Sequence, residues 1–166
     1  MSKMDKELCS RILAELLANN SLNHNRLFIY GNRQEISAMM DSFESQYRKT
    51  FPGRTVLHIC GKEFIDMIIN SVKQQIENNN VKVPDGLRKL TESDLLIFED
   101  VDSLAGCQVS MEKLYFIIDR LFEQGKTIIF AAEVPPAKIK QMEKRNISQF
   151  EGCIVMGRSQ KESTEG

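Results

Sequence analysis

Two adjacent carboxylates, Glu99 and Asp100, follow directly on Leu95-Leu96-Ile97-Phe98, the most apolar run of the chain. Carboxylate oxygens are ligands that divalent cations prefer. Together with Asp102 they could form a site for a divalent ion. Acidic residues in this position are also typical of a strand end that is simply solvated, so the pair has two interpretations.

The segments that must position these carboxylates are short apolar runs, which alternate with stretches of helical periodicity. The pattern predicts strands at 27–30, 55–60, 95–98, 127–132 and 152–156. It predicts helices at 8–17, 35–49, 62–76, 111–123 and, short and basic, at 138–144. No structure is assigned to the polar connection at 81–91.

Strands that are apolar on both faces predict a parallel sheet covered by helices on both sides, which is a three-layer α/β/α sandwich. Ligands of such folds bind beyond the carboxyl ends of the strands. That edge is expected to include Gly31, Glu99, Asp100 and Glu133.

Length and composition narrow the class of protein. No internal repeat or linker divides the 166 residues, so we expect one domain over residues 1–158 and a disordered polar tail over 159–166. The net charge of −1 excludes a global basic field for nucleic acid. Residues 1–11 lack a signal-peptide apolar segment, and no apolar run is long enough to span a bilayer, which predicts a cytoplasmic protein. The four cysteines form no Cys-x-x-Cys pair, so reduced thiols are expected rather than a metal or redox site.

Three segments form a recognisable series when they are taken in order. They are 25–31, which leads from a strand into Gly31; 94–106, which contains Glu99-Asp100 and a Leu-Ala-Gly; and 128–136, which ends in Pro-Pro and continues to 145–150. Together they resemble the AAA+ ATPase core of the bacterial replication initiator DnaA and its relatives, over about residues 25–158. The resemblance implies a P-loop NTPase-like fold with a five-stranded parallel sheet. It also implies that the family's helical lid and DNA-reading helix-turn-helix would follow Arg158, and we expect both to be absent here.

The resemblance places a degenerate phosphate loop after Gly31. A working loop reads Gly-x-x-x-x-Gly-Lys-Ser/Thr, in which backbone N–H groups and the lysine hold phosphates and the hydroxyl holds Mg²⁺. Counted without a gap, Ile36 replaces the second glycine, Ser37 the lysine and Ala38 the hydroxyl. Glu35 would repel a phosphate, and the nearby cation Arg33 lies too early to copy the lysine.

Two further family positions have lost their chemistry. The resemblance puts Ala131-Ala132 at sensor one, where the family has a polar side chain, and Gln149 at the arginine finger. Glu99 and Asp100 occupy the Walker B positions and keep their carboxylates. Because loop, sensor and finger are all altered, we expect no ATP hydrolysis and no bound cofactor. The solvated strand end is then favoured over a metal site built from Glu99, Asp100 and Asp102.

What remains is binding. Four residues form a basic cluster suited to an acidic or phosphate-bearing partner: Lys138, Lys140, Lys144 and Arg145. The stretch 62–90 has nearly balanced charge, and the Met39-Met40 pair and the apolar stripe around Phe64 are predicted to be core. The favoured function is therefore protein–protein docking around replication initiation, with an initiator, a helicase loader or another copy of the chain as partner. The alternatives are a weak single-stranded nucleic-acid-binding module and a divergent ATP-binding protein.

Overall fold

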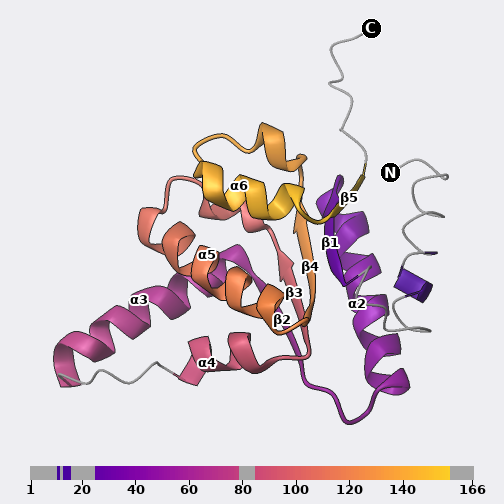
Figure 1. Cartoon of the computed structure of the whole chain (residues 1–166), viewed down its shortest axis with the longest axis horizontal. Coiled ribbons are helices and arrows are strands. Elements are labelled where there is room, and N and C mark those ends of the chain that lie inside the picture. The colour runs from indigo at the N-terminus through magenta and orange to yellow at the C-terminus, as the bar shows by residue number, and fades with distance from the viewer. Residues whose placement is uncertain (1–10, 12, 16–24, 79–84, 158–166) are drawn as a thin grey trace, which may run out of the picture.

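The computed structural model describes residue 11 and residues 13–15, 25–78 and 85–157 (Figure 1). Within them, one parallel sheet of five strands has the order β2-β3-β4-β1-β5. The strands are β1 (Arg26–Tyr30), β2 (Val56–Cys60), β3 (Leu95–Glu99), β4 (Thr127–Ala132) and β5 (Ile154–Gly157). The order reverses at β1 and β4, whose neighbouring carboxyl ends form the topological switch point where ligands of such folds bind.

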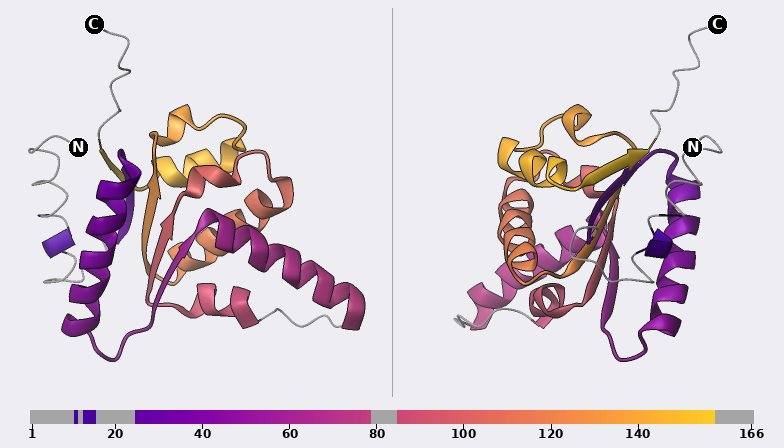
Figure 2. Two further views of the ribbon diagram at one scale, coloured as in Figure 1. Left: turned by 180° about the vertical axis from the view of Figure 1, so that it is seen from behind. Right: turned by 45° about the vertical axis from the view of Figure 1, so that its right-hand side comes forward.

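Helices cover both faces of this sheet. The helices are α2 (Arg33–Thr50), α3 (Gly61–Asn78), α4 (Asp85–Glu92), α5 (Gln108–Glu123) and α6 (Lys144–Glu151), with short 3-10 turns η2 (Val101–Leu104) and η3 (Pro136–Lys138). The helix α2 lies on one face, whereas α3, α4, α5 and α6 lie on the other (Figure 2). The predicted three-layer α/β/α sandwich with a five-stranded parallel sheet is therefore confirmed.

Alternation along the central strands explains the two apolar layers. In β3, Leu95 and Ile97 face α2, while Leu96 and Phe98 face the other helices, and all four are fully buried. The second layer contains an aromatic cluster in which the ring centroids of Phe130 and Phe150 lie 5.0 Å apart. Burial on both faces is why these runs are apolar without interruption.

Two expectations from the sequence need correction. The polar connection at 81–91 contains a helix, α4, whose Leu90 is buried; an eight-residue helix with so few apolar positions gives little periodicity. The predicted basic helix at 138–144 is wrong, because Gln141 has a φ of 61° and the helix forms at 144–151 instead. Ile139 and Met142 have helical spacing but bury themselves from an irregular segment.

The apolar stripe around Phe64 is core only in part. Phe64 and Ile68 are buried, but Ile69 and Val72 are exposed to 47% and 40%. Met40 is fully buried, as predicted, and Met39 is half-buried.

Some predictions fall wholly or partly outside the described residues. The tail at 159–166 and Cys9 lie outside, and the helix at 8–17 is described only at residue 11 and residues 13–15, which are helical. Among the helices in the described part of the chain, none is long and apolar enough to cross a membrane.

Candidate functional site

The link between β1 and α2 consists of two residues, Gly31 and Asn32. The Gly31 N–H donates to Ala132 O at 3.0 Å, which extends the sheet by one bond, and its φ of 146° favours glycine. The side chain of Asn32 then caps α2, because its Oδ1 accepts the Glu35 N–H at 3.0 Å. One of the N–H groups that a phosphate would use at a helix N-terminus is thus bonded within the chain.

The helix α2 contains the three residues that the ungapped comparison placed at the second glycine, the lysine and the hydroxyl of the phosphate loop. Ile36, Ser37 and Ala38 are its fourth to sixth residues. Ile36 is buried against the sheet, whereas Ala38 is exposed and Ser37 is half-buried. No loop therefore arches over the switch point between Gly31 and the start of α2.

The cation that faces Asp100 and Glu133 is Arg33, from the first turn of α2. Its Nε lies 3.0 Å from Asp100 Oδ1 and 3.6 Å from Glu133 Oε1. Asp100 follows β3 with a φ of 53°, a left-handed conformation that aspartate and asparagine adopt more readily than most residues other than glycine. The ion pair therefore spans the switch point, because it joins Arg33, which follows β1, to Asp100 after β3 and Glu133 after β4.

Little volume remains beneath this ion pair. The cavity there has a volume of about 10 Å³, roughly what one water molecule requires. Its lining comprises Arg33, Ile36, Glu99, Asp100, Ala131, Ala132 and Glu133. Ala131 and Ala132, the sensor-one positions, contribute methyl groups and are 3% and 4% exposed. The edge of the sheet that carries Glu99 and Asp100 is filled by side chains of the chain itself.

Glu99, the first of the two carboxylates, has a cation of its own. Its Oε2 lies 2.5 Å from Nε2 of His58 on β2, and Nδ1 of the same imidazole lies 2.7 Å from Oε1 of Glu44 on α2. Arg48 in turn donates to Glu44 at 2.9 Å. The imidazole is thus held between two carboxylates, at 16% side-chain exposure.

This arrangement favours the charged imidazole. The hydrogen bond to Glu99 raises the pKa of His58 to about 9, burial opposes the shift, and Glu44 adds to it. Burial works against ionisation of Glu44 as well, but hydrogen bonds from Arg48 and His58 hold its pKa below the usual value. At neutral pH the cluster is therefore an imidazolium between two carboxylates.

Asp102, the third acidic residue considered for a metal site, lies in η2. Its carboxylate accepts the Glu133 N–H at 3.5 Å, and burial raises its pKa, which favours the protonated form. Within the described residues, no group of three or more His, Cys, Asp and Glu side chains is arranged to hold a metal ion.

The arginine-finger position, Gln149, lies on α6 and faces α5. Its Nε2 donates to Tyr115 O at 2.9 Å, and one turn earlier Asn146 Nδ2 donates to Met111 O at 2.9 Å. The opposite oxygens of both amides are buried without a hydrogen-bond partner in the described residues. These two side chains fix α6 to the backbone of α5.

The basic cluster is distributed over η3, the following loop and the start of α6, and its four side chains are exposed. Arg145 is partly neutralised, because its Nε lies 3.0 Å from Glu143 Oε2. Its guanidinium also lies 4.7 Å from the ring centroid of Tyr115 and 5.8 Å from that of Phe116. A surface of cations and aromatic rings therefore spans α5 and α6.

Sequence reasoning missed His58 and Glu44 as partners of the acidic pair. His58 lies opposite Ile97 in the register of β2 and β3, so its side chain emerges on the same face as Glu99, two residues further along β3. The sequence offered one indication of this contact, which is a histidine in the strand that precedes the one ending in Glu99. Its meaning depends on a register that the sequence does not specify.

The sheet order, the switch point between β1 and β4 and the acidic end of β3 define the P-loop NTPase-like class of α/β proteins. The family model described as "Bacterial DnaA ATPAse domain" matches residues 5–157. The chain belongs to this family.

Similar proteins agree with this assignment. The chromosomal replication initiator DnaA of Bifidobacterium animalis subsp. lactis is 28% identical over 158 residues, which cover 92% of this chain and 27% of that protein. The crystal structure of domain III of Thermotoga maritima DnaA has a TM-score of 0.83 at 21% identity, over 95% of this chain and 63% of that one. A replication initiator DnaA bound to AMPPCP and single-stranded DNA has a TM-score of 0.76 at 22% identity, over 90% and 45%. The chain spans about a third or less of the length of the full-length initiators that it matches, 27% of the Bifidobacterium protein and 32% of DnaA from Acinetobacter baumannii.

Proposed function

We propose that this chain is a nucleotide-independent member of the DnaA ATPase-domain family, which acts by docking to other proteins in or around replication initiation. One observation carries the proposal. The switch point, where a nucleotide would bind, is closed by the ion pair of Arg33 with Asp100 and Glu133 over a cavity of about 10 Å³.

Charge supports the same conclusion. A triphosphate at this edge would meet Asp100 and Glu133, and it would have to displace them from Arg33. It would also lack the loop of N–H groups that wraps phosphates, because Gly31 and Asn32 are the whole link between β1 and α2. Ala131 and Ala132 offer no polar side chain to a transferring phosphate, and the Gln149 amide, which is bonded to Tyr115 O, carries no charge. The proposal therefore excludes ATP hydrolysis.

The partner follows from the family. The relatives are replication initiators, and a role around initiation is carried over to this chain by analogy with them. We propose that the partner is an initiator, a helicase loader or another copy of the chain. Size-exclusion chromatography with light scattering, of the chain alone and mixed with the initiator of its host, tests this part. A chain that stays monomeric in both runs contradicts docking.

Nucleotide independence predicts that millimolar Mg·ATP leaves the melting temperature unchanged within about 1 °C, since ligands stabilise only the states they bind. A site with micromolar affinity would instead add about 4 kcal/mol at this concentration, or roughly 8–16 °C. Differential scanning fluorimetry makes the measurement, with the DnaA that was solved bound to AMPPCP as the positive control. A rise of several degrees would sink the proposal. The variant Arg33→Ala is expected to remain unresponsive, because removing the side chain does not rebuild the loop.

One observation favours a second function, weak binding of single-stranded nucleic acid. Phe116 is 56% exposed beside Arg145, and aromatic rings next to cations can stack bases. A relative was solved with single-stranded DNA. Fluorescence anisotropy with labelled single strands at two salt concentrations separates the alternatives. Salt-sensitive binding that Phe116→Ala abolishes would support this function.

A further inference from the structure

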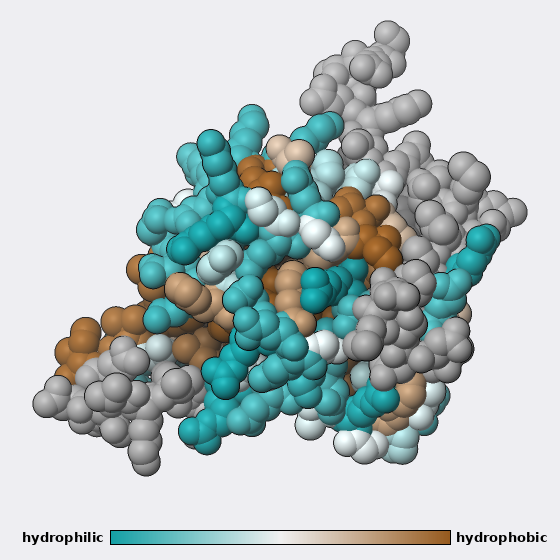
Figure 3. Space-filling model, viewed as in Figure 1, coloured by the Kyte–Doolittle hydropathy of each residue, from teal (hydrophilic) through white to brown (hydrophobic). Residues whose placement is uncertain are grey.

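The helix α3 carries an apolar face on which several side chains are exposed. Phe64 and Ile68 anchor its first half in the core, and its second half projects away from the sheet (Figure 2). Ile69, Val72 and Ile76 are exposed to 47%, 40% and 78%. Hydrophobic residues gather over this end of α3, at the lower left of Figure 3. Contiguous exposed apolar residues on a soluble domain commonly mark an interaction surface.

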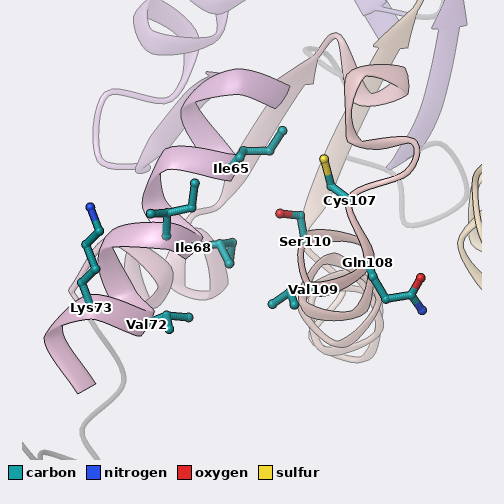
Figure 4. Close-up of a pocket in the computed structure, with 9 residues that line it drawn as sticks. Ile65, Ile68, Val72, Lys73, Cys107, Gln108, Val109 and Ser110 are labelled. Atoms are coloured by element: carbon teal, nitrogen blue, oxygen red, sulfur yellow. The ribbon is translucent and has the colours of Figure 1, made fainter. Parts of the chain in front are cut away.

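A groove runs beside these residues, between α3 and the start of α5. It has a volume of about 520 Å³, and Ile65, Ile69 and Val72 line it from one side. Val109, which is 51% exposed, lines it from α5. Figure 4 shows Val72 and Val109 pointing toward each other across the groove, whereas Lys73 points away from it. The groove is therefore an apolar seat with a charged side chain at its margin.

The spacing of the stripe is compatible with a second copy of α3 in this seat. Ile65, Ile69, Val72 and Ile76 follow one another at intervals of four, three and four residues. These intervals are the same when read backwards. Two copies of α3 in antiparallel orientation therefore place Ile65 opposite Ile76, and Ile69 opposite Val72, twice. A two-fold interface requires this self-complementarity, because each surface must match itself.

The charges along the stripe obey the same symmetry. At 100° per residue, Asp66 and Lys73 lie on one flank of α3, and both are exposed. They are seven residues apart, too far along the helix to pair within one copy. In the antiparallel arrangement each Asp66 comes within one helical turn of Lys73 from the other copy. Two equivalent ion pairs would then border the apolar stripe on the same side.

We propose that α3 is a self-association surface, through which two copies of this chain pack as an antiparallel, two-fold symmetric pair. The surface lies apart from the nucleotide-site edge and does not depend on the absence of nucleotide binding. One helix and part of a groove form a small interface, which makes the dimer reversible. A melting response to Mg·ATP would overturn the proposed nucleotide independence and leave the dimer untouched.

Sedimentation velocity across about 5 to 500 µM, a range suited to small transient interfaces, tests the proposal. We expect a concentration-dependent shift from monomer to dimer. Ile76→Asp is expected to weaken the dimer at least about tenfold, because it places a carboxylate in the apolar stripe. Val155→Asp is the matched control, since Val155 is an exposed apolar residue on β5, and it should leave the dimer unchanged.

A charge exchange tests the two-fold geometry itself. Asp66→Lys and Lys73→Asp should each weaken the dimer, because like charges then face each other. The double variant should restore it, because the pairs re-form with opposite polarity. A monomer at all concentrations would overturn the proposal. A dimer that Ile76→Asp does not weaken, or self-association that appears only after single-stranded DNA is added, would also overturn it.

Discussion

Replacing His58 with glutamine is expected to destabilise the fold by about 2 kcal/mol near pH 6. The imidazolium bridges Glu44 and Glu99 at 2.7 and 2.5 Å, and glutamine cannot supply its charge. Glu44 keeps Arg48 at 2.9 Å, but Glu99 loses its cation while it stays half-buried. The melting temperature should therefore fall by about 4–8 °C, measured by calorimetry or circular dichroism.

The pH dependence of this loss identifies its cause. A histidine whose pKa is raised from 6.5 to about 9 on folding stabilises fully below about pH 6.5, and the contribution disappears as the pH rises through about 9. A shift of this size corresponds to at most about 3 kcal/mol, and solvent near the cluster reduces it to about 2. The difference between the wild-type protein and His58→Gln should therefore shrink between pH 7 and 10. Asp41, whose Oδ1 lies 3.9 Å from Nδ1 of His58, is largely exposed and should alter this window little.

A double-mutant cycle provides the control. If the charge pair carries the effect, His58→Gln costs little once Glu99→Gln is present, because the carboxylate that needed a cation is gone. Equal melting temperatures of the wild-type protein and His58→Gln at pH 6 would contradict the ion-pair interpretation. A difference that stays constant from pH 6 to 10 would also contradict it.

Gly61→Ala is the second substitution with a large expected effect. A Cβ at Gly61, the first residue of α3, would lie 1.9 Å from Ser103 Oγ and 2.5 Å from the backbone oxygen of Asp100. A serine side chain can rotate, but the backbone after β3 is held by the bonds of Ser103 N and Oγ to that same oxygen, at 3.0 and 2.6 Å. We expect a loss of about 2–3 kcal/mol, or roughly 5–10 °C in melting temperature.

Gly53→Ala is the matched control for Gly61→Ala. A Cβ at Gly53 would have no atom within 4 Å, so the change should stay within about 0.5 kcal/mol. Gly61→Ala combined with Ser103→Ala should remain destabilised, because the Asp100 oxygen is still in the way. If Gly61→Ala and Gly53→Ala have the same melting temperature, the close approach of α3 to η2 does not constrain the fold.

The sheet could be predicted because its strands are apolar on both faces. Leu95–Phe98 and Ile128–Ala132 are almost entirely buried, and uninterrupted apolar runs between polar segments are the simplest pattern that a sequence offers. The helix α4 could not be predicted in the same way, because its apolar side is short. The position of α6 depends on the left-handed conformation of Gln141. A glutamine in the sequence gives no indication of that conformation.

The site was less accessible to sequence reasoning. The ends of the strands placed Glu99 and Asp100 at the correct edge, and the family resemblance identified the altered positions around them. The histidine that pairs with Glu99 could not be predicted, since His58 is 41 residues from Glu99 in the sequence and 14 from Glu44, its other partner. Such contacts are set by strand register and by the rotation of α2 over the sheet. Arg33 was noted as a cation, but its bond to Asp100 required the two-residue link to be known.

Among the described residues, Arg33 and His58 are the cations that face the acidic edge. Under the proposed function, the edge therefore carries the same charges at every ratio of ATP to ADP. The energy state of the cell would then not regulate the protein through this edge. If copies of the chain also meet through α3, its remaining control variable is abundance. The level of expression would then set the fraction paired, as nucleotide exchange can set the state of an ATP-binding protein.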